Sequence, residues 1–214
     1  MGFEELYEKL KTSHGPQGKW WPGSQEEIIV SVILTQNTNW KNVEKALKNV
    51  KSICKENILI CLSKLSTEEL AMLIRPAGFH NVKAKRIKSL IEWIKKYDFS
   101  LDGIVKKDLY ELRNELISIN GIGKESADSI LLYAFEKPIF VVDAYTKRLV
   151  KRVLDIEFKE YDEYRTFFEE KYKKSVELYQ EFHGLIVEHC KIYCRNIPRC
   201  MACPLNYCCL YNSK

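Results

Sequence analysis

Apolar residues recur every three or four positions along most of the chain, a spacing that places them on one face of an α-helix. After Ser24, four Ile and Val residues follow this spacing, and two glutamates occupy the first turn. Ser24 is therefore expected to cap a helix, and Ser66 with Glu69 has the form of a capping box that starts another. Pro76 and Gly78 should end that second helix. The same pattern predicts helices over residues 42–50, 83–97, 109–119, 124–135, 144–154, 161–172 and 178–193.

One short run, residues 139–142, has the character of a strand, but it is short enough to be a buried connector. The sequence shows no internal repeat and no low-complexity tract. With 214 residues the chain can form one large or two small domains. No apolar run approaches the roughly 20 residues of a membrane span. We predict an all-α, soluble protein that does not associate with a membrane.

The formal net charge of +5 is modest, but the positive charge is segregated. Between Arg75 and Lys96 there are seven basic residues and one acidic residue, whereas residues 157–181 hold eight acids and five bases. Segregated positive charge suits a polyanion such as nucleic acid. A solvated helix face explains the basic run equally well, so this run alone does not decide between the two.

Six of the eight cysteines lie in the C-terminal stretch of residues 190–209, here called the tail, at Cys190, Cys194, Cys200, Cys203, Cys208 and Cys209. Sulfur atoms this dense can chelate one inorganic centre, and a short tail without an apolar core needs such a centre to hold its shape. Zinc usually takes two paired knuckles, and only Cys200 and Cys203 have the CxxC form. An uneven, all-cysteine set favours a four-iron cluster over zinc. Disulfides fit least, because they are typical of small secreted chains, and Cys54 and Cys61 lie in helix-like sequence.

A tight turn joins two of the predicted helices at residues 120–123, Asn-Gly-Ile-Gly. Its two glycines let the backbone approach a partner closely, and the N–H groups that open the next helix, beside Lys124, form a phosphate site. Taken alone, such a turn is more commonly an ordinary helical hairpin. Twenty residues after Gly123, Asp143 ends an apolar run and starts a helix, where by itself it reads as an N-cap.

The order of these motifs resembles the helix-hairpin-helix DNA glycosylases of the endonuclease III superfamily, from about Trp20 to Cys209. The resemblance implies two helical domains: residues 1–22 with 136–214, carrying a [4Fe–4S] cluster loop, and residues 23–135, a six-helix barrel with the hairpin. It also implies double-stranded DNA with a damaged base as the partner, lying across the face between the domains. We expect a monomer in the cytoplasm, associated with the nucleoid.

By this resemblance Asp143 is the catalytic carboxylate, which stabilises positive charge on the deoxyribose and helps water to reach C1′. Gly121, Gly123 and Lys124 would grip a DNA phosphate. Bifunctional members of the family carry a lysine two residues after the second hairpin glycine, which forms a Schiff base and cuts the strand. Here that position is Glu125, and Lys124 is turned about 100° away on the helix. A glutamate cannot form an imine, so we expect a monofunctional enzyme.

Gln36 and Phe79 match the family residues that stabilise a flipped base. Gln36 would fill the space that the extruded base leaves, and Phe79 would intercalate on the opposite strand, both lowering the cost of flipping. Phe79 could instead be a core aromatic residue, but its position after Pro76 and Gly78 predicts an exposed loop tip.

The motifs together, including Trp-Trp-Pro at residues 20–22 and Phe-His-Gly at residues 182–184, resemble the 3-methyladenine branch of this superfamily. By that resemblance Trp20, Trp21, Pro22 and Trp40 line the base pocket. A cationic alkylated purine would be held there by cation–π contacts of ~1–2 kcal/mol. It is already a good leaving group, so no strong general acid is needed. The two adjacent tryptophans could also simply staple the N-terminal segment to the core.

The common family spacing of cluster cysteines is Cys-x6-Cys-x2-Cys-x5-Cys, and the first gap here is five residues. The implied ligands are Cys194, Cys200, Cys203 and Cys209, with Cys208 as the alternative to Cys209. Some members of the 3-methyladenine branch lack the cluster, so the cofactor does not determine the activity. We expect a structural role for it.

Two other functions remain open from the sequence. One is an endonuclease III-like glycosylase for oxidised pyrimidines, against which Glu125 and the tryptophan cluster argue. The other is a non-catalytic DNA-binding module with a metal-stabilised tail, in which Asp143 is only a helix cap.

Overall fold

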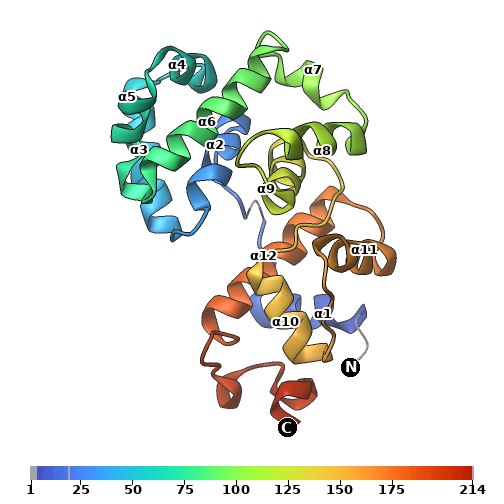
Figure 1. Ribbon diagram of the computed structural model, residues 1–214. Helices are drawn as coiled ribbons and strands as arrows, with labels where there is room; N and C mark the ends of the chain where they lie inside the picture. Colours follow the sequence, from blue (N-terminus) through green and yellow to red (C-terminus); the bar gives the residue numbers. More distant parts are fainter. Residues whose placement is uncertain (1–3, 19, 214) are drawn as a thin grey trace. The chain divides into compact units, whose positions relative to one another are not determined.

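The computed structural model describes residues 4–18 and 20–213, which are mainly helical and contain no β-strand (Figure 1). The predicted all-α class is confirmed. The chain divides into two compact units, unit 1 with residues 1–20 and 137–214, and unit 2 with residues 21–136. Within the described residues, no helix is long and apolar enough to cross a membrane.

Unit 2 is built around one buried helix, α2. All seven residues from 28 to 34 are buried, so this helix is apolar on every side and packs against α3, α4, α6 and α9. The elements of unit 2 are α2 (Gln25–Thr35), α3 (Trp40–Ile53), α4 (Ile58–Lys64), α5 (Thr67–Leu73), a 3-10 turn (Arg75–Ala77), α6 (His80–Lys95), α7 (Leu101–Val105), α8 (Leu109–Ser118), α9 (Lys124–Ser129) and a π-helical turn (Ile130–Ala134).

The N-cap predicted at Ser24 and the capping box predicted at Ser66 with Glu69 are confirmed. Ser24 also forms a capping box with Glu27, which was not predicted. The start of α6 is a correction, because the helix begins at His80, three residues before the predicted position. The first residues of α6 lie at the surface and break the apolar period, while Phe79 ahead of them takes a left-handed conformation with φ 46°. The helix predicted over residues 124–135 is also divided, because α9 gives way to the π-helical turn.

A disulfide between Cys54 and Cys61 was not predicted. Cys54 caps the end of α3, Cys61 lies in α4, and their Cα atoms are 5.6 Å apart. The short helix α4 and the helix α1 were likewise not predicted as separate elements. The bond closes the connection between α3 and α4 into a small loop.

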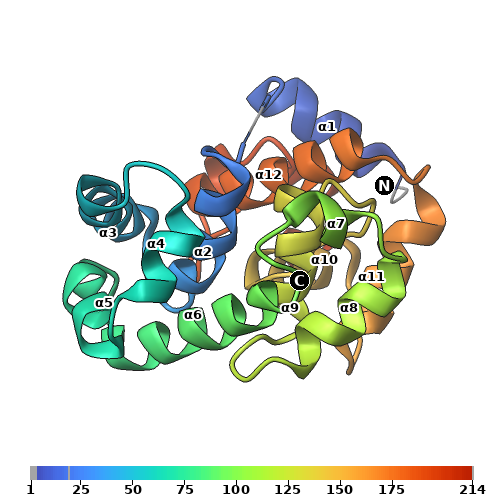
Figure 2. The same ribbon diagram turned by 90° about the horizontal axis from the view of Figure 1, so that it is seen from above.

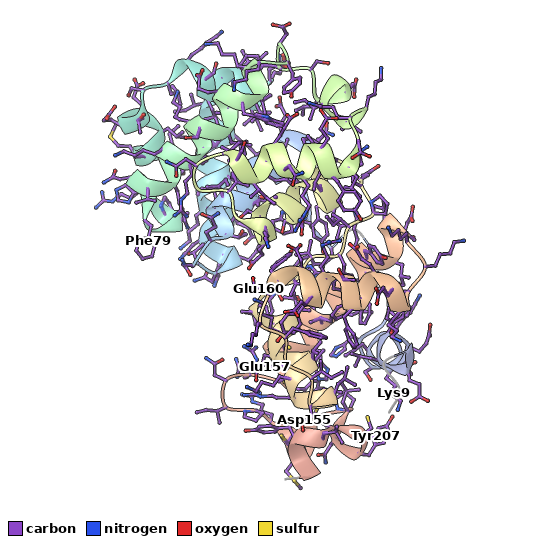
Figure 3. All side chains as sticks on the ribbon, turned by 45° about the vertical axis from the view of Figure 1, so that its right-hand side comes forward. Lys9, Phe79, Asp155, Glu157, Glu160 and Tyr207 are labelled. Atoms are coloured by element: carbon purple, nitrogen blue, oxygen red, sulfur yellow. A yellow bond between two sulfur atoms is a disulfide. The ribbon has the colours of Figure 1, made fainter. Side chains whose placement is uncertain are left out.

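In unit 1, α1 (Glu4–His14) lies beside α12 (Val176–Ile192), although the two are far apart in sequence (Figures 1 and 2). The unit also contains α10 (Ala144–Leu154), α11 (Tyr161–Lys171) and three 3-10 turns, Cys200–Ala202, Asn206–Cys208 and Leu210–Ser213. Residues 139–142 form no strand and are buried, as predicted. Phe140 stacks on Phe168 in the core, with ring centroids 4.0 Å apart. The tail is held to α1 where Lys9 lies 5.0 Å from the ring of Tyr207 (Figure 3).

Candidate active site and cysteine cavity

Asp143 caps the N-terminus of α10 and keeps one oxygen for another contact. Its Oδ1 accepts hydrogen bonds from the Thr146 backbone N–H at 2.7 Å and from the Thr146 hydroxyl at 2.9 Å. Its Oδ2 lies 3.5 Å from Nε2 of His183, a buried residue of α12. The side chain of Asp143 is 16% exposed. Asp143 is therefore an N-cap, and it also carries a carboxylate oxygen that the cap does not use.

The surroundings of Asp143 favour its charged form. Burial tends to raise the pKa of this carboxyl, but the interactions with His183 and the hydrogen bonds from Thr146 outweigh burial and hold the pKa below its usual range. The carboxylate is thus an anion at neutral pH. Chemically it can stabilise a positive charge, but it cannot donate a proton.

Trp20 and His183 lie together in unit 1. Their rings meet edge to face with centroids 5.5 Å apart, and Trp20 Nε1 donates to Glu188 at 3.4 Å. Gly184 makes this contact possible, since a Cβ there would lie 2.7 Å from Trp20 Cγ. His183 lies in the Phe-His-Gly run at residues 182–184, but its contact with Asp143 was not predicted from the sequence. A glycine inside a helix destabilises the helix by about 1 kcal/mol relative to alanine. Gly184 within a predicted helix therefore indicated that another side chain packs closely against the helix at this position.

Trp21 and Trp40 form a second aromatic group, in unit 2. Trp21 is buried and donates through Nε1 to the Ser31 hydroxyl at 2.8 Å. Its ring meets Trp40 edge to face at 6.0 Å and Tyr133 at 5.0 Å. Trp40 is half-buried, and Pro22 is exposed. The four predicted pocket residues are thus divided, because Trp20 belongs to unit 1 and the other three belong to unit 2.

Gln36 contacts the hairpin directly. Its Nε2 donates to the Gly121 carbonyl at 3.3 Å and to the Ser126 hydroxyl at 3.0 Å. Nη1 of Arg86, on α6, donates to Gln36 Oε1 at 2.5 Å. The structure therefore brings two predicted DNA-contacting features together, and it adds Arg86 and Ser126, which sequence reasoning missed.

The second half of the hairpin leads into α9. Gly123 caps this helix, Lys124 is half-buried in its first position, and Glu125 follows with an exposed side chain. Phe79 lies elsewhere in unit 2, at the turn before α6, where it is 69% exposed (Figure 3). The prediction that Phe79 lies at an exposed tip is confirmed.

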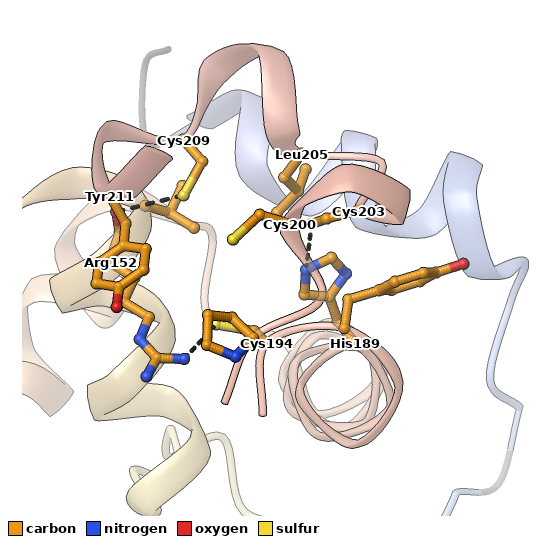
Figure 4. A pocket seen from close by; sticks show the side chains of 11 residues that line it. Arg152, His189, Cys194, Cys200, Cys203, Leu205, Cys209 and Tyr211 are labelled. Carbon is orange, nitrogen blue, oxygen red and sulfur yellow. Dashed lines mark hydrogen bonds between the residues drawn. The ribbon is translucent and has the colours of Figure 1, made fainter. Parts of the chain in front are cut away.

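Four of the eleven residues that line a small cavity in unit 1 are cysteines (Figure 4). Cys208 is not among its lining residues, and its thiol donates to the Leu205 carbonyl at 3.3 Å. Across the described part of the chain, no three His, Cys, Asp or Glu side chains are placed to hold a metal ion. The cavity is lined by Arg152, Val153, His189, Tyr193, Cys194, Pro198, Cys200, Cys203, Leu205, Cys209 and Tyr211.

The cavity thiols differ in acidity. A hydrogen bond with Cys190 and the nearby Arg152 guanidinium, 3.6 Å from Cys194 Sγ, lower the pKa of Cys194 below that of an ordinary thiol. Burial raises the pKa of Cys203 to about 11, and its sulfur lies 3.5 Å from His189 Nε2. Cys209 donates to the Arg152 carbonyl at 3.4 Å. Of Cys194 and Cys203, Cys194 is therefore the more ready to act as a thiolate ligand.

The described residues thus combine an all-helical fold, a Gly-Ile-Gly hairpin before α9 and an ionised aspartate at the start of α10. The chain belongs to the HhH-GPD superfamily of base excision DNA repair proteins, whose family model matches residues 30–174.

Several relatives are similar over nearly the whole chain. A putative DNA repair glycosylase of Methanocaldococcus jannaschii is 47% identical over 212 residues, covering 96% of this chain and 94% of the relative. Endonuclease III of Thermotoga maritima is 29% identical over 192 residues, covering 87% and 84%.

Solved structures show the same fold. The 3-methyladenine DNA glycosylase of H. pylori, bound to 1,N6-ethenoadenine, is 35% identical with a TM-score of 0.79, covering 88% of this chain and 96% of that protein. A non-covalent endonuclease III–DNA complex superimposes with a TM-score of 0.83 at 20% identity, covering 100% and 98%.

Proposed function

We propose that this chain is a monofunctional DNA glycosylase that removes alkylated purines, such as 3-methyladenine, from double-stranded DNA. The observation that carries the proposal is the ionised Asp143, with no proton to donate at neutral pH. An alkylated purine is already cationic, so it leaves without a proton from the enzyme. What the reaction needs instead is a negative charge beside the sugar.

The proposed reaction is a hydrolysis. The bond between C1′ and the purine nitrogen breaks, and its electron pair leaves with the base, which departs neutral. Water adds to C1′ and releases a proton to solvent. Asp143 stabilises the positive charge on the sugar between these events, through the oxygen that does not cap α10. The 35% identity to the H. pylori 3-methyladenine DNA glycosylase supports this substrate class.

The abasic product is left uncut, because Glu125 occupies the position of the Schiff-base lysine and carries no amine. The half-buried Lys124, one position earlier, contributes to phosphate binding with Gly121 and Gly123.

The remaining predicted residues act on the flipped base and the space it leaves. Trp20, Trp21, Pro22 and Trp40 hold the cationic base in this proposal, with the tryptophans contributing cation–π attraction. Trp21 is buried in the core of unit 2, so of the two predicted tryptophans in that unit the half-buried Trp40 has more ring surface exposed.

The deciding experiment is base release from a duplex containing 3-methyladenine, with and without alkaline treatment of the product. We expect release by the wild type, strand cleavage only after alkali, and loss of release in Asp143→Asn with DNA binding retained. Unchanged release in Asp143→Asn would contradict the role of Asp143. Binding without release from any alkylated or oxidised duplex would indicate a non-catalytic module.

The relative from T. maritima favours a second candidate, an endonuclease III-like enzyme for oxidised pyrimidines. The same assay separates the two. Strand cleavage without alkali, from a duplex with an oxidised pyrimidine, would support this candidate and would require a lysine other than the one missing at position 125.

Within the same proposal, Cys194, Cys200, Cys203 and Cys209 hold a [4Fe–4S] cluster. These four cysteines line one cavity, and the lowered pKa of Cys194 suits thiolate coordination. Bound there, the cluster would cross-link a tail that has little apolar core of its own. Iron and sulfide analysis with a visible spectrum distinguishes it from zinc. We expect Cys209→Ser to lose iron and Cys208→Ser to retain it, and the reverse result would exchange the two cysteines.

A further inference from the structure

Both the nitrogen and the oxygen of the Gln36 side-chain amide form hydrogen bonds within unit 2. The Nε2 group donates to Gly121 and Ser126 of the hairpin, and Oε1 accepts from Arg86. An amide with donors on one side and an acceptor on the other can be held in one orientation only. The orientation of Gln36 is therefore fixed by three contacts from two different elements.

The Arg86 side chain reaches Gln36 by passing over Gly121, where the hairpin has no side chain. Gly121 has φ +88°, a conformation that favours glycine, and a Cβ there would lie 2.6 Å from Arg86 Cδ. The stem of Arg86 thus lies against the Gly121 backbone while its guanidinium holds Gln36. The hairpin glycine serves this contact as well as the turn.

The same helix, α6, holds the end of α2 at a second point. The ammonium group of Lys83 is buried and donates to the Leu34 and Ala77 carbonyls, each at 2.8 Å. Lys83 and Arg86 are three residues apart and lie on one side of α6. Together they fix the segment that carries Gln36 and the turn that precedes Phe79.

We propose that Arg86 is a positioning residue that holds Gln36 against the hairpin, ready to fill the space left by an extruded base. This inference rests on the proposed function, because it assumes that role for Gln36. Holding the side chain in place before DNA binds removes an ordering cost that would otherwise oppose base flipping. Arg86 then acts through Gln36 rather than by attracting phosphates.

The test is a double-mutant cycle of Arg86→Met, Gln36→Met and the double variant. Methionine keeps the stem of Arg86 that packs on Gly121, and thermal melts verify folding. The main readout is the ratio of affinities for a duplex with an abasic analogue and for an intact duplex. Both duplexes carry the same phosphates, so general charge effects cancel in this ratio. It also does not depend on which base the enzyme releases.

We expect each single variant to lower the ratio by about 10- to 100-fold, the range for losing a hydrogen bond to a charged group. The double variant should be no worse than the poorer single variant, because both changes remove the same interaction. Additive losses would overturn the proposal, and so would a wild-type enzyme without preference for the abasic duplex.

Two further variants separate positioning from charge. Lys85→Met removes one positive charge from the same helix at an exposed position, and it should weaken both affinities alike without changing the ratio. Arg86→Lys keeps the charge but loses the planar fork, so the ratio should fall. A ratio unchanged in Arg86→Lys would overturn the proposal. Wild-type failure to release alkylated purines, with the non-additive pattern intact, would contradict the proposed substrate and leave this inference standing.

Discussion

The two oxygens of Asp143 have different partners, and this difference sets the charge of the residue. Oδ1 accepts from Thr146 as an N-cap does, whereas Oδ2 faces His183. A cap alone needs only the first of these contacts. The sequence raised a choice between a structural cap and a reactive carboxylate, and the geometry allows both roles at once.

Replacing His183 should therefore shift the pH dependence of the proposed activity. His183→Phe removes an interaction that lowers the pKa of Asp143, while the burial that raises it remains. The pKa of Asp143 should therefore rise. Because the ionised form is the active one, the acidic limb of kcat/KM for base release should move to higher pH. His183→Gln, which retains a hydrogen-bond donor, should shift the limb less. A limb that stays in place in His183→Phe would mean that His183 does not control the charge of Asp143.

Lys83 is a second residue whose charge is set by its surroundings. Burial and the neighbouring Arg86 lower its pKa to about 8, from 10.5. Its ammonium is nevertheless used, since it donates to two main-chain carbonyls that face the interior. Burying a charge is unfavourable, and these hydrogen bonds offset part of that cost.

This pKa gives a stability prediction with a definite sign. Between about pH 8 and 10.5 the folded state loses the Lys83 proton while the unfolded state keeps it. The free energy of unfolding should therefore rise with pH by roughly 3 kcal/mol from this group. Urea titrations across this pH window should show that rise in the wild type and its absence in Lys83→Met. Parallel pH profiles for the two proteins would contradict the prediction.

At the scale of elements, the two helices of the hairpin are joined by a buried ion pair. Arg113 of α8 meets both oxygens of Asp128 on α9, at 2.6 and 3.1 Å, and the Asp128 side chain is fully buried. Asp128→Asn should lower the free energy of unfolding by about 3–5 kcal/mol, because it leaves a buried guanidinium without its counter-charge. Urea denaturation measures this, and the exposed Asp102→Asn is the control, with a change within about 0.5 kcal/mol. Equal midpoints for the two variants would refute the argument.

Helix positions were predictable wherever local chemistry decides them. Ser24 and Ser66 place side-chain oxygens at helix starts, and both serines cap their helices as predicted. The start of α6 was not predictable from periodicity, because its first turn is exposed and only tertiary packing of the residues behind it completes the helix. The change from α-helix to π-helical turn after Ser129 was likewise not predictable, because a prediction from periodicity assumes one fixed helical period.

Contacts across elements were the part of the candidate site that sequence could not supply. Asp143 and Gln36 were found from motifs, but their partners His183 and Arg86 lie 40 and 50 residues away in the chain. No spacing rule links residues so distant in sequence. The disulfide between Cys54 and Cys61 was missed although the two residues are close in sequence. Both were expected inside helices, whereas Cys54 caps the end of α3.

For the whole molecule, the eight cysteines divide between the two units. Unit 2 holds the disulfide, and unit 1 holds six free cysteines, four of which line the cavity. The two kinds of cysteine should therefore respond to different treatments. A reductant should act on the stability of unit 2, while removal of the proposed cluster should act on the tail of unit 1.

Thiol counting tests this division directly. After removal of metal, the unfolded wild type should expose six reactive thiols without reductant, which is the number of free cysteines, and all eight after reduction. The variant Cys54→Ala with Cys61→Ala should show six in both cases and keep its full iron content, because the proposed ligands belong to unit 1. It should be less stable by about 2–3 kcal/mol, since a short closed loop no longer restricts the unfolded chain. Eight thiols before reduction would mean that the disulfide is absent in solution. Loss of iron in the variant would mean that iron binding by the cysteines of unit 1 depends on Cys54 and Cys61.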